Sequence, residues 1–185
     1  MSKKISVKNL TLSAVFVALI VLGGFIRFPI GVIPVKLQTL FVLLAGSLGG
    51  KRVGAVSCAV YLLMGLVGIP VFALGGGLFY IFKPTFGYLL AFTVASVIAG
   101  TVKRGLIKRI IVNACAVIVI HLIGVSYFYL ISNYYLETPI SVWESILTGS
   151  LFFLPIDIIS AVISAILSYK LYNVVHRNER QKEKV

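Results

Sequence analysis

The sequence predicts an all-α integral membrane protein built as a bundle of six transmembrane helices. Three observations support this prediction. The chain is 59% hydrophobic and only 12% charged, its mean hydropathy is +1.07, and its basic residues lie in short clusters between long apolar runs. An ordinary soluble domain of 185 residues is far less apolar, so we expect most of this chain to contact lipid.

The uncharged or nearly uncharged runs occupy residues 10–26, 37–50, 53–82, 86–102, 110–136 and 146–169. A transmembrane helix needs about 20 apolar residues, so the chain holds about six spans with short loops and no separate soluble domain. The first run is too long for a signal peptide and has no Ala-x-Ala cleavage site before Arg27, which favours a spanning helix. The second run is short and indicates a tilted or partial span.

The third run is too long for one helix. Glycine and proline at Gly68-Ile69-Pro70, followed by three glycines from Gly75, predict that a helix ends near Val67 and that a non-helical segment follows it. The resulting loop at 68–85 is apolar and aromatic, and irregular backbone exposed to lipid would leave its polar groups unsatisfied. It is expected either to form a lid over an outward-facing pocket or to pack on neighbouring helices, and both interpretations are equally supported.

The distribution of basic residues predicts that both termini are cytoplasmic. Alternating the sides from a cytoplasmic N-terminus places 14 of the 17 basic residues inside, as the positive-inside rule requires. The outer side receives only Arg27, Lys36 and Lys83, with Glu137 and Glu144. The expected organisation is a single membrane domain, with an N-terminal segment at 1–9, the helix bundle at 10–172 with its external loop 68–85, and a basic tail at 173–185.

Asp157 is the most informative candidate for a binding site. A carboxylate within a transmembrane helix costs about 2.5 to 3.5 kcal/mol on insertion scales and normally faces inward, so it needs a partner, a proton or a ligand. Pro155 frees a backbone carbonyl nearby and is able to kink the helix wall. Ligand contact is the favoured interpretation, and pairing with Arg27 or Lys36 is the alternative.

Other polar side chains within the apolar runs are weaker candidates. Gln38 has an amide that both donates and accepts hydrogen bonds, and Thr85 with Tyr88 would combine a hydroxyl with an aromatic wall, although interfacial anchoring explains tyrosine equally well. His121 has no metal-ligand spacing and is expected to make a hydrogen bond between helices. Ala14 and Ala18 would allow another helix to approach closely, but similar spacings recur along the chain.

Several functional classes are excluded or weakened. The basic clusters do not form a nucleic-acid-binding surface, because they separate apolar runs. The segment Gly49-Gly50-Lys51-Arg52 lacks the upstream glycine and the Ser or Thr of a Walker A loop. No nucleophile with a matched base and no carboxylate pair supports an enzyme, and neither a metal nor a cofactor is expected. A proton-coupled carrier that uses Asp157 remains an alternative.

Three stretches resemble the BioY family, the biotin-specific S-components of energy-coupling-factor (ECF) importers. They are residues 33–46 (IPVKLQTLFVLLAG), 65–73 (GLVGIPVFA) and 84–92 (PTFGYLLAF), and residues 154–157 (LPID) resemble the motif of the family's final helix. The resemblance implies a six-helix subunit of the bacterial cytoplasmic membrane. Such a subunit captures biotin at the outer face and delivers it inward by toppling while docked on a transmembrane coupling subunit that carries two ATPases.

The resemblance also implies roles for individual residues. Asp157 would bind the polar head of biotin, and Ala14 and Ala18 would contact the coupling subunit. Gln38 and Tyr88 match motif positions of the family and would be pocket neighbours. The glycine-rich loop, which carries Phe72, Tyr80 and Thr85, would close over the ligand.

The sequence departs from the family pattern near the expected site. Ser160 replaces a lysine that usually follows the aspartate by three residues, Lys36 stands in place of a threonine, and Lys83 and Phe86 stand in place of glycines. Lys36 or Lys83 would then supply the cation. The alternative ligands are lipoate and dethiobiotin.

Overall fold

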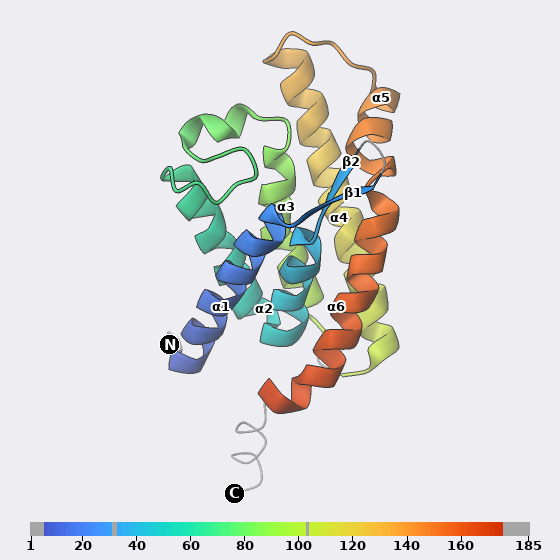
Figure 1. Cartoon of the computed structure of the whole chain (residues 1–185). Helices are drawn as coiled ribbons and strands as arrows, with labels where there is room; N and C mark the ends of the chain where they lie inside the picture. Colours follow the sequence, from blue (N-terminus) through green and yellow to red (C-terminus); the bar gives the residue numbers. More distant parts are fainter. Residues whose placement is uncertain (1–5, 31–32, 103, 176–185) are drawn as a thin grey trace, which may run out of the picture.

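The computed structural model describes residues 6–30, 33–102 and 104–175, and these residues form a helical bundle (Figure 1). In chain order the elements are α1 (Val7–Phe25), β1 (Arg27–Ile30), β2 (Ile33–Lys36), α2 (Gln38–Leu66), the 3-10 helix η1 (Leu78–Phe82), α3 (Phe86–Ala99), α4 (Leu106–Tyr134), α5 (Val142–Ile146), the π-helical turn η2 (Leu147–Leu151) and α6 (Leu154–Val175). The predicted helical class is confirmed, and the helix of the third run ends at Leu66, as expected.

A short β-hairpin corrects the expectation of a purely helical chain. β1 and β2 pair antiparallel, with Arg27 opposite Lys36 and Pro29 opposite Pro34. Proline lacks a backbone N–H, and a two-stranded ribbon tolerates it because each strand has an unpaired edge. The hairpin connects α1 to α2 and brings Lys36 to the start of α2.

Helix α2 reverses direction at Gly50. This glycine has a φ of +84°, a conformation that favours glycine and breaks a regular helix. In a straight helix, Gln38 and Tyr61 would lie about 34 Å apart, yet the amide of Gln38 donates to the Tyr61 hydroxyl at 2.7 Å. The halves 38–49 and 51–66 therefore lie side by side (Figure 1). The short second run forms the first half.

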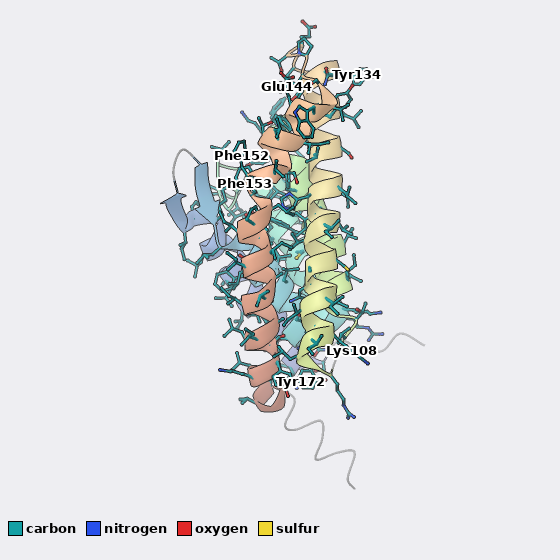
Figure 2. The ribbon with its side chains drawn as sticks, turned by 90° about the vertical axis from the view of Figure 1, so that its right-hand side faces the viewer. Lys108, Tyr134, Glu144, Phe152, Phe153 and Tyr172 are labelled. Carbon is teal, nitrogen blue, oxygen red and sulfur yellow. The ribbon has the colours of Figure 1, made fainter. Side chains whose placement is uncertain are left out.

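Among the residues that the structure describes, four stretches are long and apolar enough to cross a membrane: Val7–Phe25, Gln38–Leu66, Leu106–Tyr134 and Val142–Tyr172. Helix α3 is a shorter apolar helix. The start of α1 and the end of α6 lie at the same end of the bundle (Figure 1). Lys108 and Tyr172 also lie at this end, whereas Tyr134 and Glu144 lie at the opposite end (Figure 2). Below, the two ends are called the lower and the upper end, as in the figures.

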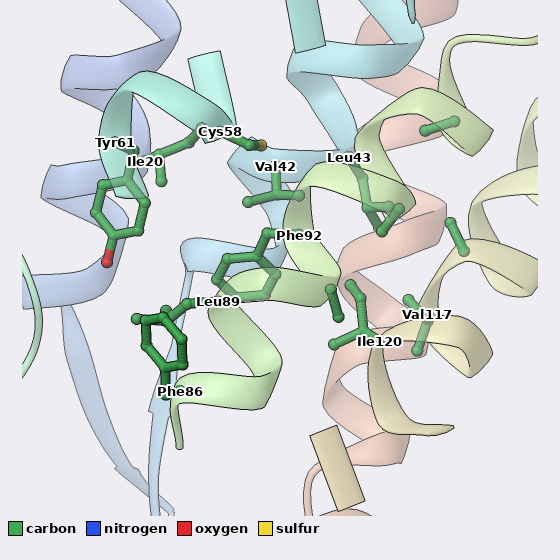
Figure 3. Close-up of a cluster of buried hydrophobic side chains, with 14 of the residues drawn as sticks. Ile20, Val42, Leu43, Cys58, Tyr61, Phe86, Leu89, Phe92, Val117 and Ile120 are labelled. Atoms are coloured by element: carbon green, nitrogen blue, oxygen red, sulfur yellow. The ribbon is translucent and has the colours of Figure 1, made fainter. Parts of the chain in front are cut away.

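The core between α1, α2, α3 and α4 combines large apolar side chains with small residues at the closest helix contacts (Figure 3). Ile20, Val42, Leu43 and Ile120 are almost completely buried. A Cβ atom placed on Gly54 would lie 2.9 Å from the Cα of Gly46, so the two halves of α2 meet backbone to backbone. In a membrane, where the hydrophobic effect does not drive helices together, such close contacts supply much of the attraction.

A buried polar network joins α2, α4 and α6 near the lower end. The Arg109 side chain is 1% exposed and donates to the Ser47 carbonyl at 2.7 Å, while its guanidinium lies 4.8 Å from the centre of the Tyr172 ring. The Ser47 hydroxyl donates to Asn113 at 2.8 Å, and the Asn113 amide donates to the Ala161 carbonyl at 3.3 Å. Arg109, expected only as a topology signal, is therefore also part of the interior packing.

Candidate binding cavity

A cavity of about 330 Å³ is lined by residues of β2, α2, the loop 68–85, α3, α4, η2 and α6. Its volume is within the range of small-molecule sites. The apolar wall includes Leu89, Phe92, Ile120, Phe128 and Phe153, which come from α3, α4 and the segment just before α6. The polar wall is small, as expected for a site in which a few groups orient an otherwise apolar ligand.

Six of the nine side chains that the sequence analysis selected as ligand contacts line this cavity: Lys36, Gln38, Tyr80, Thr85, Tyr88 and Asp157. The other three do not line it. Phe72 is buried behind the wall, Ser160 is buried on α6, and Lys83 is exposed after η1. Thus, neither Ser160 nor Lys83 faces the cavity.

Asp157 lies in the first turn of α6. Its backbone N–H bonds to the Phe153 carbonyl at 3.0 Å, and Pro155 is the second residue of the helix, where its missing N–H breaks no helical hydrogen bond. Pro155 therefore belongs to the start of α6, whereas the sequence indicated a kink inside a longer helix. An ionised carboxylate at a helix N-terminus interacts favourably with the helix dipole.

The hydrogen-bond partner of Asp157 is His121 on α4. The distance between His121 Nε2 and Asp157 Oδ2 is 3.1 Å, and the two side chains are 6% and 15% exposed. The expectation that His121 bonds between helices is confirmed. Both side chains line the cavity, so the pair forms a polar group in its wall.

Tyr88 contributes its aromatic ring to the wall. Its hydroxyl donates to the Gly149 carbonyl of η2, and its ring lies edge-on to the His121 ring, with the ring centres 6.2 Å apart. The hydroxyl is therefore engaged in holding α3 against η2. A Cβ atom on Gly124 would overlap the Tyr88 ring, so this glycine gives the ring its space.

Gln38 is 5% exposed and is held by the hydrogen bond to Tyr61 described above. Because its NH₂ group faces Tyr61, its carbonyl oxygen remains an acceptor for a ligand. Tyr61 also lines the cavity, although the sequence offered no reason to distinguish it from other tyrosines.

The loop 68–85 both packs on the bundle and lines the cavity, so each of the two expectations describes part of it. Phe72 inserts between Tyr61 and Tyr80, with ring-centre distances of 5.4 and 4.5 Å. Tyr80 and Thr85 reach the cavity. The Tyr127 hydroxyl on α4 donates to the Ile81 carbonyl and attaches η1 to the bundle.

The sequence of this chain matches a known family. The model of the BioY family covers residues 1–177. The chain belongs to the BioY family. It is 39% identical over 179 residues to the probable biotin transporter BioY of Lysinibacillus sphaericus, an alignment covering 94% of this chain and 91% of the relative. It is 30% identical to the biotin transporter BioY of Thermotoga maritima, covering 89% of this chain and 95% of that protein.

A solved structure also has a similar fold. The crystal structure of the S-component for biotin from an ECF-type ABC transporter matches with a TM-score of 0.76 at 27% identity, covering 92% of this chain and 94% of that chain. The prediction of a transport protein of the S-component type, and of no enzyme, is therefore confirmed by family membership. The expected multi-pass membrane protein agrees with the apolar helices described above.

Sequence reasoning missed part of the cavity in this BioY family member. His121 was treated as structural, and Thr39, Tyr61, Thr148 and Phe153 received no role, although all five line the cavity. A signal was present for His121, because a polar side chain inside a transmembrane helix marks a functional candidate. The other four depend on which helix faces meet, which requires the fold. Within the described residues, no group of three His, Cys, Asp or Glu side chains could hold a metal ion.

Proposed function

We propose that this chain is the substrate-binding subunit of a biotin importer and that the cavity at Asp157 is its biotin site. The observation that supports this most strongly is a half-buried carboxylate in the wall of a small-molecule cavity, in a chain whose relatives are named biotin transporters. The fold match to an S-component for biotin adds to it.

The chemistry of biotin fits the cavity. Biotin has a cyclic urea with two N–H donors and one carbonyl, an apolar thioether ring and an alkyl chain that ends in a carboxylate. Asp157 would accept from an N–H of the urea, and Phe92, Tyr88 and Phe153 would contact the rings. The cavity of about 330 Å³ suits a ligand of this size. Lys36, which lines the cavity, would attract the ligand carboxylate.

We further propose that the chain crosses the cytoplasmic membrane of a bacterium six times, with both termini inside. Counting the two halves of α2 separately gives six segments: α1, 38–49, 51–66, α3, α4 and α6. The reversal at Gly50 places Lys51 and Arg52 in a turn, in agreement with the positive-inside rule. The cavity then lies toward the outer side, where biotin would enter.

A partner with ATPase subunits would drive uptake, because this chain has no Walker A loop. Ala14 and Ala18 are both exposed on α1, so they are accessible to a helix of a coupling subunit.

Replacing Ala18 with tryptophan is expected to leave biotin binding unchanged and to reduce biotin uptake at least tenfold in cells that contain an ECF module. Ile118→Trp, at a half-exposed position of α4, is the control. Uptake that is lost equally in both variants would refute the assignment of the docking face.

Titration calorimetry of the purified, detergent-solubilised chain with biotin, dethiobiotin and lipoate tests the proposed function. We expect biotin to bind in a 1:1 ratio, dethiobiotin to bind more weakly because it lacks the thioether ring, and lipoate to bind worst because it has no urea. Preference for lipoate would assign a different vitamin. Uptake by vesicles that contain only this chain, driven by a pH gradient, would instead support a proton-coupled carrier.

A further inference from the structure

Small side chains form the buried face of α6. Among the described residues of this helix, the buried ones are all serine or alanine and recur at helical spacing: Ser160, Ala161, Ser164, Ala165 and Ser168. Small side chains let helices approach closely, but they form only low ridges to interlock with a neighbouring helix. Apolar packing on this face therefore gives α6 little preference for one axial position over another.

The buried side chain of Asn113 on α4 adds specific hydrogen bonds to this contact. Asn113 is 0% exposed. Its amide NH₂ donates to the Ala161 carbonyl at 3.3 Å and to the Ser164 hydroxyl at 3.4 Å, both on α6. Its oxygen accepts from the Ser47 hydroxyl of α2 at 2.8 Å. Both ends of the amide are thus engaged between helices, and together they connect α6 to α4 and to α2.

The Asn113 contact and the contact between His121 and Asp157 specify the same helix register. Helices α4 and α6 run in opposite directions, since Lys108 and Tyr172 lie at the lower end and Tyr134 and Phe153 lie above them (Figure 2). From Asn113 up to His121, α4 advances eight residues, or about 12 Å. From Ser164 up to Asp157, α6 advances seven residues, or about 10.5 Å. A slip of α6 by one turn, about 5.4 Å, would break both contacts and remove Asp157 from its place in the cavity wall.

We propose that Asn113 is a positioning residue, which fixes α6 in the axial register that holds Asp157 in the cavity wall. This inference rests on the proposed function, because it is the proposed function that gives Asp157 its role toward biotin. In coiled coils, a single buried asparagine sets the register of helices whose apolar residues would tolerate other alignments. The Ala161 carbonyl that accepts from Asn113 lies one helical turn below Asp157, so this bond acts close to the site.

An Asn113→Leu variant removes these hydrogen bonds and keeps a side chain of similar shape. Helix α6 should then populate more than one register, and the apparent biotin affinity should fall in proportion to the fraction of molecules in the native one. We expect biotin binding to weaken about 3- to 15-fold, the range that corresponds to interhelical hydrogen bonds in membrane proteins. Calorimetric titration of the purified protein in detergent measures this effect.

Ser57→Ala is the matched control. Ser57 is also 0% exposed, and its hydroxyl donates to the Ser13 carbonyl at 3.2 Å, so it too makes a buried hydrogen bond between helices. That bond joins α2 to α1 and does not involve α6. Ser57→Ala should therefore bind biotin with the affinity of the unmodified chain.

A double-mutant cycle separates positioning from general destabilisation. If Asn113 acts through Asp157, Asn113→Leu has little further effect on the biotin affinity of an Asp157→Asn protein. An equal loss of affinity in both backgrounds would overturn the positioning role. Thermal unfolding in detergent confirms that each variant is folded, and Asn113→Ala removes the same hydrogen bonds if leucine disrupts folding.

The register of α6 is also measurable without a ligand. Cys115 is exposed on α4 and Cys58 is buried, so spin labels on Cys115 and on the cysteine of a Tyr169→Cys variant report the axial position of α6 by electron paramagnetic resonance. We expect one narrow distance distribution when Asn113 is present. In Asn113→Leu the distribution should broaden or shift by up to about 5 Å, and biotin should narrow it again.

The possible results distinguish this inference from the proposed function. If both Asn113 variants bind biotin like the unmodified chain, or if Asn113→Leu leaves the spin-label distance unchanged, the positioning role is overturned and the proposed function stands. If the unmodified chain does not bind biotin, the proposed function is overturned, and the spin-label distance alone decides whether Asn113 fixes the register.

Discussion

Replacing Asp157 with asparagine is expected to weaken biotin binding roughly 10- to 150-fold. A hydrogen bond to a charged group contributes about 1.5 to 3 kcal/mol, and each 1.36 kcal/mol corresponds to a tenfold change. Asparagine has nearly the same shape and still accepts from His121, so the packing of α4 against α6 should persist. The substitution removes the negative charge and adds an NH₂ group that would face the ligand N–H.

Calorimetric titration of the Asp157→Asn protein measures this effect. Glu144→Gln is the control, because Glu144 is a carboxylate on α5 that caps its own helix through Ser141 and does not line the cavity. That variant should bind biotin with unchanged affinity. If Asp157→Asn is folded and binds biotin as tightly as the unmodified chain, the carboxylate does not contact the ligand.

The second large effect is expected for Gly46→Ala, which should destabilise the fold by about 1–3 kcal/mol. A Cβ atom on Gly46 would lie 2.9 Å from the carbonyl carbon of Ser96 and still closer to its oxygen. Backbone atoms of α3 have no alternative rotamer, so relief would require α2 and α3 to move apart. Gly46 also contacts Gly54 across the turn of α2, so the same methyl group would disturb two helix contacts.

Unfolding of the purified protein in detergent, followed by circular dichroism, measures this loss. Ser126→Thr adds a methyl group at an exposed position of α4 and serves as the control. The control should unfold like the unmodified chain. Equal stability of Gly46→Ala and the unmodified chain would mean that α2 and α3 are not in close contact at this position.

Much of the helical arrangement was predictable because lipid imposes a simple constraint. Long apolar runs must be helical, so the runs around α1, α3 and α4 were recognised from composition alone. The end of α2 at Leu66 followed from the glycines and the proline after it. The reversal of α2 at Gly50 was predictable because two basic residues, Lys51 and Arg52, interrupt the apolar pattern there.

The β-hairpin and the start of α6 were not predictable in the same way. Residues 27–36 contain neither Asn-Gly nor Asp-Gly, and their two prolines, Pro29 and Pro34, argue against strands. Near α6, the apolar run begins at residue 146, the last residue of α5, and it includes η2 and the break before Leu154. An apolar run indicates contact with lipid or with the protein interior, but it does not indicate where one helix ends and the next begins.

The candidate site was predictable only in part. Asp157 was evident because a charge inside an apolar run is rare. Its partner was not evident, since His121 lies 36 residues earlier in the chain and only the packing of α4 against α6 brings the two together. Phe72 was selected for its place in an aromatic loop, but such a composition does not distinguish a side chain that faces a cavity from one that packs behind it.

The location of biotin in an experimentally determined structure of the complex tests the central claim most directly. We predict that the urea of biotin lies within hydrogen-bonding distance of the Asp157 carboxylate, and that its rings pack against Tyr88 and Phe92. Biotin bound elsewhere on the chain, with no ligand atom in contact with Asp157, would contradict the assignment of this cavity as the binding site.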